Sequence, residues 1–113
     1  MRQGDTVTVL DREQLREITL EDEELMRLLV AALIEDTERQ IPLLALAIRA
    51  MDAPQCASLA HYCKGACANV GAKGAAAILE RIERHAAHGT FDECGTQLAA
   101  LAEQVEQLRA EKI

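Results

Sequence analysis

Apolar residues recur every three or four positions along most of this chain, a spacing that places them on one side of an α-helix. The first long stretch of this kind runs from Leu20 to Met51 and contains Pro42. Proline removes a helical hydrogen bond and clashes with the preceding turn. We therefore predict one long helix kinked just before Pro42, or two helices that break between Arg39 and Ile41. The positions expected to be buried are Leu25, Leu28, Leu29, Ala32, Leu33, Ile34, Ile41, Leu44, Ala45 and Ile48.

Helix-capping residues divide the rest of the chain. Thr19 with Asp22 is expected to begin the long helix, and Asp52 is expected to cap a following helix that ends near residue 70, where Gly71 supplies a turn. The next helix is expected over residues 72–88, and Gly89 ends it. Thr90-x-x-Glu93 has the spacing of a capping box and would open the last helix. That helix is expected to bury Leu98, Leu101, Val105 and Leu108.

A short helix is predicted within residues 9–18, where Asp11 can act as the cap and Leu10, Leu15 and Ile18 can close one end of the core. Short connections between amphipathic helices are typical of antiparallel neighbours. We therefore predict an all-α protein, an up-and-down antiparallel four-helix bundle with a short additional N-terminal helix. Residues 1–8 are predicted to be a flexible N-terminus, and residues 9–113 to form the bundle domain.

The composition fits a helical bundle, because hydrophobic residues make up 50% of the chain and aromatic residues only 2%. A formal net charge of −7 argues against nucleic acid as a partner. The sequence shows neither an apolar run long enough to span a membrane nor, in its first ten residues, the apolar core of a secretion signal. We therefore expect a cytoplasmic protein with no membrane contact, whose four cysteines are reduced.

The predicted helix over residues 53–70 has two contrasting faces. One face carries His61 together with small or charged residues, Ala57, Ser58, Lys64, Gly65 and Ala68. The opposite face is apolar and carries Cys56, Leu59, Cys63, Ala66, Cys67 and Val70. A glycine inside a helix costs about 1 kcal/mol relative to alanine, so a glycine beside His61 suggests that a bulky group approaches there. The simpler interpretation is a solvated helix face that happens to carry a histidine.

The stretch His61-x-x-Lys64-Gly65-Ala66, followed by Val70-Gly71-Ala72, resembles the signature of the histidine phosphotransfer (HPt) domain of two-component phosphorelay systems. The chain departs from that signature at Cys63, where the family usually has an aliphatic residue. Cysteine behaves as a small hydrophobic residue on a buried face, so this departure concerns packing. The resemblance extends from about Val9 to the C-terminus as a matching run of helices.

The resemblance implies a phosphoryl carrier rather than an enzyme. It implies that His61 accepts a phosphoryl group on Nε2 from a receiver-domain aspartate and passes it to another receiver, that Lys64 stabilises the phosphate, and that Ala57, Gly65 and Ala68 lie where partners dock. The implied partners are response-regulator receiver domains and hybrid histidine kinases, which supply the catalysis and the Mg²⁺, so this chain needs no cofactor. A neutral imidazole is itself a nucleophile near neutral pH. The exposed face around His61 carries no carboxylate that could act as a base, and a self-contained bundle permits a monomer.

Two other functions are consistent with the sequence. Cys63 and Cys67 lie one turn apart on a helix, as His85 and His88 nearly do, and antiparallel helices could bring the four together as a zinc or redox site. Buried cysteines, and histidines that interact with the dipole of a helix C-terminus, are the commoner outcome. A bundle that binds receiver domains without carrying phosphate is the second alternative. Cys94, in the first turn of the last helix, is expected to be exposed and has no assigned role.

Overall fold

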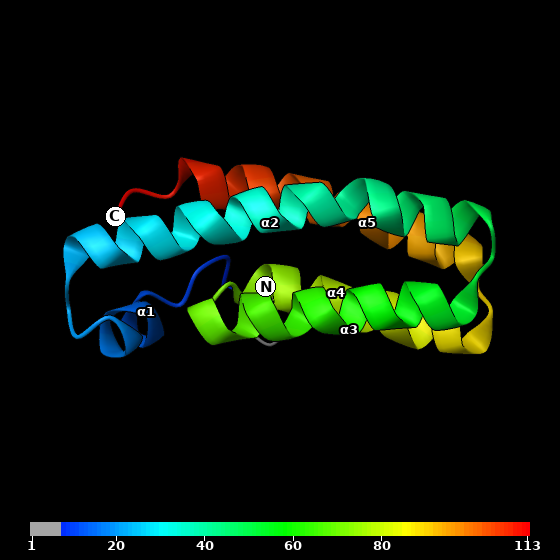
Figure 1. Ribbon diagram of the computed structural model, residues 1–113, viewed down its shortest axis with the longest axis horizontal. Coiled ribbons are helices and arrows are strands. Elements are labelled where there is room, and N and C mark those ends of the chain that lie inside the picture. Colours follow the sequence, from blue (N-terminus) through cyan, green and yellow to red (C-terminus); the bar gives the residue numbers. More distant parts are fainter. Residues whose placement is uncertain (1–7) are drawn as a thin grey trace, which may run out of the picture.

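The computed structural model describes residues 8–113, so the predicted flexible segment lies, apart from Thr8, outside the described residues. Four long helices run antiparallel as an up-and-down bundle, and a short helix lies at one end, next to the start of α2 and the end of α3 (Figure 1). Around the bundle, α3 packs against α2 and α4, and α5 packs against α2 and α4. The predicted all-α fold is therefore confirmed. The helices are α1 (Arg12–Ile18), α2 (Glu23–Arg49), α3 (Ala53–Val70), α4 (Lys73–His88) and α5 (Phe91–Ala110).

The helix ends follow most of the capping signals in the sequence. Asp11, Asp22 and Asp52 precede α1, α2 and α3, and each accepts a hydrogen bond from the backbone N–H three residues later, at 3.1–3.2 Å. At the other ends, Gly71 follows α3 with φ +98° and Gly89 follows α4 with φ +75°. These are left-handed conformations that glycine adopts readily, so each helix stops where the sequence indicated.

Thr19 and Thr90 do not make the helix-capping contacts that the sequence predicted. Thr19 does not begin α2 but ends α1, and its hydroxyl donates to the backbone carbonyl four residues earlier at 2.7 Å. Asp22 alone caps α2. Thr90 precedes α5, yet its hydroxyl donates backward to the His85 carbonyl at 3.1 Å. The expected capping box with Glu93 is therefore wrong, because the end of α4 competes for the same hydroxyl.

The long helix α2 continues through the exposed Pro42, so the alternative of two separate helices is wrong. Its N-terminal half is rotated relative to the expected face. Met26 and Val30 are buried, whereas Leu25 is 39% and Leu28 is 57% exposed. Apolar residues occur on both sides of this half of the helix, so its own pattern did not determine which side would meet α3 and α5.

The core runs the length of the bundle and is closed at one end by Leu10 and Leu15. Ile18, which was expected beside them, is 47% exposed because it lies in the last turn of α1, on the side away from the bundle. Among the helices within residues 8–113, none is both long enough and apolar enough to cross a membrane. The large side chains that are fully enclosed in the core are those of Leu15, Leu44, Leu79, Ile82, Leu101, Val105 and Leu108.

The segment that begins α1 holds the C-terminal end of α3. The backbone N–H of Asp11 donates to the Gly71 carbonyl at 2.7 Å, and the Asp11 carboxylate forms an ion pair with Lys73 at 3.1 Å. Gln14 Nε2 donates to the Ala68 carbonyl, also at 2.7 Å. Carbonyls in the last turn of a helix lack intrahelical partners, so these bonds satisfy α3 and fix its end against α1.

Candidate functional site

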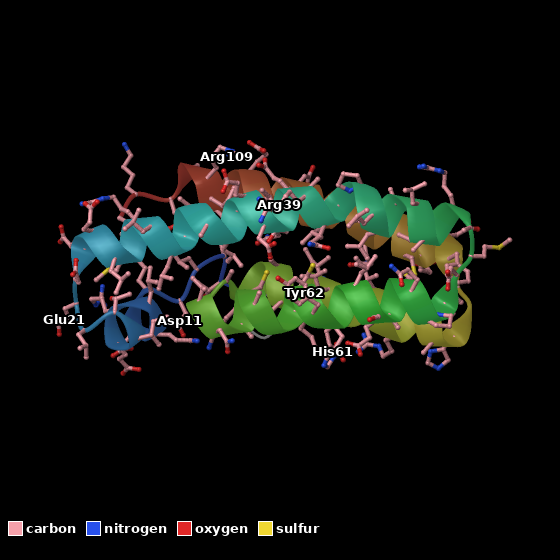
Figure 2. The ribbon with its side chains drawn as sticks, viewed as in Figure 1. Asp11, Glu21, Arg39, His61, Tyr62 and Arg109 are labelled. Atoms are coloured by element: carbon pink, nitrogen blue, oxygen red, sulfur yellow. The ribbon has the colours of Figure 1, made fainter. Side chains whose placement is uncertain are left out.

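His61 lies in the middle of α3, with its side chain 68% exposed. The side chain projects from α3 away from α2 (Figure 2). Gly65 and Ala68 on the same face are exposed, and a Cβ built on Gly65 would meet no heavy atom of the described chain within 4 Å. Ala57 is half-buried and packs against the core, so it offers less surface than expected. The accessible histidine with open space beside it is thus confirmed, whereas the docking role of these residues stays a prediction.

The opposite face of α3 is occupied by thiols. Cys56, Cys63 and Cys67 are buried, while Leu59 and Val70 are half-buried. Burial raises the pKa of the Cys63 thiol to about 12 and the pKa values of Cys56 and Cys67 to about 11. These thiols therefore remain protonated and pack as small hydrophobic groups, which explains how cysteine can occupy an aliphatic position of the signature.

Across from His61, helix α4 contributes Glu83. Oε2 of Glu83 lies 3.2 Å from Nδ1 of His61, and Oε1 of the same carboxylate accepts a hydrogen bond from Nζ of Lys64 at 2.9 Å. The expectation that no carboxylate lies near His61 is therefore wrong. The prediction failed because the residue pattern of α3 gives information on that helix alone, whereas Glu83 belongs to the neighbouring helix α4.

The charges of this site are arranged around the carboxylate. The hydrogen bond from Lys64 holds the pKa of Glu83 below its ordinary value, and His61 contributes in the same direction. The carboxylate is therefore ionised near neutral pH. Within residues 8–113, Nε2 of His61 forms no hydrogen bond, so this nitrogen faces solvent while Nδ1 faces Glu83. Lys64 is only 29% exposed at its side chain, in contrast to a freely solvated lysine.

A tyrosine that the sequence patterns did not single out lies on the other flank of His61. The Tyr62 side chain is directed toward α2 (Figure 2), where its hydroxyl donates to Oδ2 of Asp36 at 3.2 Å. The negative charge of Asp36 raises the pKa of the Tyr62 phenol. Tyr62 is nevertheless 56% exposed. Its exposed ring therefore lies on the side of α3 that faces α2, whereas the imidazole of His61 projects from a different side.

The two other histidines have local roles at the end of α4. Nδ1 of His85 lies 2.8 Å from the hydroxyl of Thr90, and Nδ1 of His88 donates to the Arg84 carbonyl, also at 2.8 Å. Both contacts tie the end of α4 to its own last turn or to the following cap. They agree with the expectation that these histidines belong to a helix C-terminus.

The cysteines do not join those histidines. Cys63 and Cys67 point into the core, and residues 8–113 contain no group of three or more His, Cys, Asp or Glu side chains that could hold a metal ion. The arrangement does not favour the zinc alternative. Cys94 is fully buried, with its sulfur 3.7 Å from the Ile82 carbonyl, so its expected exposure is wrong. The first turn of α5 packs against α4, which covers that position.

The family model described as Hpt domain matches residues 28–111, which include His61, Lys64 and Glu83. The chain therefore belongs to the Hpt domain family, whose members carry phosphoryl groups in phosphorelays, and the resemblance seen at residues 61–72 is confirmed. Among solved structures, the chain is similar to histidine-containing phosphotransfer protein B (HptB) from Pseudomonas aeruginosa PAO1, with a TM-score of 0.82 and 23% identity over 92% of this chain and 90% of that one. This likeness supports the fold. A comparison with curated proteins gives no match.

Proposed function

We propose that His61 accepts a phosphoryl group on Nε2 from a receiver-domain aspartyl phosphate and passes it to the aspartate of another receiver. The observation that carries this proposal is the arrangement of the ring, with Nδ1 directed at Glu83 and an exposed Nε2. A carrier must present a nucleophile without a base or metal aimed at the bound phosphate. The Glu83 carboxylate contacts Nδ1 and not Nε2, so the site meets that requirement.

Lys64 and Gly65 are proposed to assist in different ways. A phosphoryl group brings about two negative charges, and Lys64 supplies a cation one turn along α3 from His61. Gly65 leaves open the space through which a receiver must bring its aspartate close to the imidazole. Ala68 is exposed and extends this surface of small residues. Ala57 is half-buried and adds less to it.

The partners are proposed to be receiver domains of response regulators or of hybrid histidine kinases. Such a domain supplies the aspartate and the Mg²⁺ that stabilises the transferring phosphoryl group. The chain is then a carrier that uses no cofactor of its own. His61, Lys64 and Glu83 come from α3 and α4 of one chain, so a monomer contains the whole site. A cytoplasmic location, where receivers are found, remains our prediction.

The test is incubation with a receiver domain carrying radiolabelled phosphate, in the presence of Mg²⁺. We expect acid-labile, alkali-stable label on the wild-type chain, no label on His61→Gln, and full label on the matched variants His85→Gln and His88→Gln. Because His61 is exposed, the free energy of unfolding of the His61→Gln variant should lie within about 0.5 kcal/mol of the wild-type value. Full labelling of His61→Gln would contradict the proposal. Receiver binding by a wild type that takes no label would favour the alternative of a non-phosphorylated binding module.

A further inference from the structure

The outer side of α2 exposes leucines near both of its ends. The helix packs against α3 and α5, and its remaining side faces solvent. Leu28 is 57% exposed toward one end and Leu46 is 56% exposed toward the other, with Leu25 and Leu43 beside them at 39% and 46%. Exposed apolar surface of this kind marks interaction sites. Six exposed residues follow this side in a line that we call the outer stripe: Leu28, Ala32, Glu35, Arg39, Pro42 and Leu46.

The outer stripe reads the same from either end. Its spacings alternate between four and three residues, as in the seam of a coiled coil, and its midpoint lies at residue 37. A second copy of α2 that runs antiparallel, related by a two-fold axis at that point, therefore meets the stripe in register. The facing pairs, each formed twice, are Leu28 with Leu46, Ala32 with Pro42 and Glu35 with Arg39.

We propose that the outer stripe is the interface of an antiparallel homodimer. Within residues 8–113 Glu35 forms no ion pair, and Arg39 is paired only with Asp36 of its own helix, at 3.2 Å and with its side chain 64% exposed. Both charges are therefore available for a partner. In the dimer each acid faces an arginine of the other copy at the centre of the stripe, and leucine meets leucine at both ends.

The size of this contact predicts a weak dimer. Leu28 and Leu46 are about 27 Å apart along the helix, at 1.5 Å per residue. A single pair of helices of this length buries less than the roughly 1,200 Å² of a standard interface. The net charge of −7 on each copy also opposes association, although physiological salt screens charges more than about 8 Å apart. We therefore expect a dissociation constant of about 10 µM or weaker.

The dimer leaves the histidine site open. His61 projects from α3 away from α2 (Figure 2), and its neighbours Lys64 and Glu83 lie on α3 and α4. A second copy seated on α2 therefore covers none of these three residues. Each copy keeps a complete site of its own, and the proposal goes beyond the proposed function without depending on it.

Sedimentation equilibrium between about 10 µM and 1 mM, at physiological salt, tests the dimer. The apparent mass of the wild type should rise toward twice that of the monomer. Glu35→Arg makes both central positions basic and Arg39→Glu makes both acidic, so each variant alone should associate at least tenfold more weakly. An equal mixture of the two variants restores opposite charges across the axis and should dimerise as the wild type does.

Helix α4 supplies a matched control. Glu80 and Arg84 are exposed residues with the same spacing as Glu35 and Arg39, and they form an ion pair at 2.8 Å. Glu80→Arg and Arg84→Glu should therefore leave the association of the chain unchanged. Circular dichroism checks that all four variants keep the helical fold.

Three outcomes would overturn the proposal. The first is a wild type that stays monomeric at 1 mM, and the second is a mixture of Glu35→Arg and Arg39→Glu that fails to associate. The third is a monomeric wild type whose phosphoryl transfer from a receiver domain is slowed by Leu46→Gln, which would assign the outer stripe to the receiver. Absence of label on His61 would contradict the proposed function and leave the measured dimer intact.

Discussion

Nζ of Lys64 lies 2.9 Å from Oε1 of Glu83, so the lysine of the signature is already paired before any phosphoryl group arrives. On phosphorylation of His61, Lys64 must turn from the carboxylate or be shared between the two anions. Hydrogen bonds to charged groups contribute about 1.5–3 kcal/mol, less where solvent competes. We therefore expect Lys64→Ala to lower the equilibrium constant for phosphoryl transfer to His61 by roughly three- to tenfold, measured by labelling over a range of phosphorylated-receiver concentrations. Lys73→Ala removes a lysine that is paired with Asp11 instead of Glu83, and this variant should leave labelling unchanged.

The same ion pair predicts how stability depends on pH. The folded-state pKa of Glu83 is lowered relative to the unfolded chain, so its stabilising contribution is complete above the unfolded value of about 4.3 and is lost as the pH falls through the folded value. Both side chains are partly exposed, which limits the pair to about 1 kcal/mol or less. Urea unfolding should show Lys64→Ala less stable than the wild type at pH 7, with the difference shrinking below about pH 4. A difference that grows in acid would contradict the pairing.

Gly65 and Gly95 are both exposed glycines within helices, and a Cβ on either would meet no heavy atom of the described chain within 4 Å. Leucine is a far better helix former, so Gly65→Leu and Gly95→Leu should each stabilise the fold, by up to about 1 kcal/mol. Only Gly65 lies one turn from His61. We expect Gly65→Leu to slow transfer from a receiver at least tenfold and Gly95→Leu to leave the rate unchanged, as single-turnover labelling would show. Equal rates in both variants would mean that partners do not approach over Gly65.

Gly71 and Gly89 both end helices in the left-handed conformation, but their surroundings differ. A Cβ on Gly71 would lie 2.9 Å from the backbone oxygen of Asp11, whereas one on Gly89 would meet no described heavy atom within 4 Å. The left-handed conformation costs an alanine about 1–2 kcal/mol at either position. Overpacking adds about 1–3 kcal/mol, so Gly71→Ala should be the more destabilising variant by at least about 1 kcal/mol in urea unfolding. Equal losses of unfolding free energy in the two variants would show that the contact between α1 and the end of α3 accommodates the added methyl group at no energetic cost.

Two leucines on α2 test the face that this helix buries. Leu33 is 5% exposed, while Leu28, which its spacing had placed in the core, is 57% exposed. Leu33→Ala should lower the free energy of unfolding by about 2–5 kcal/mol, and Leu28→Ala by no more than about 0.5 kcal/mol. Denaturant melts of the two variants give this comparison directly. A larger loss for Leu28→Ala would restore the helical phase predicted from the sequence.

The comparison of these leucines shows where sequence reasoning reached its limit. Local signals were sufficient to locate the ends of the helices, because Asp52, Gly71 and Gly89 act within one turn of the residues they cap. The faces of α3 were also readable, since its cysteines and its small residues lie on opposite sides. In α2 the apolar residues surround most of the N-terminal half, so the buried side depends on neighbouring helices.

Contacts between helices were the second limit. His61 and Lys64 could be found from one helix, but Glu83 joins them from α4, 22 residues after His61 in the sequence. A signal for it existed: Glu83 directly follows Ile82, which is buried in α4, and the helix over residues 72–88 was expected to be an antiparallel neighbour of the helix that carries His61. Only the relative rotation of the two helices, set by packing, brings the carboxylate to the ring. Cys94 was mistaken for the same reason, because α4 covers it.

Tyr62 gives this molecule a spectroscopic property of its own. The chain contains one tyrosine and no tryptophan, so its ultraviolet emission comes almost wholly from Tyr62, the residue that follows His61 in the sequence. The Tyr62 ring is exposed, and its hydroxyl is bonded to Asp36 of α2. A macromolecule that covers the exposed Tyr62 ring as well as His61 therefore changes the environment of the main fluorophore. Binding to a receiver domain that lacks both tryptophan and tyrosine can be followed by intrinsic fluorescence, without attaching a dye or altering this chain.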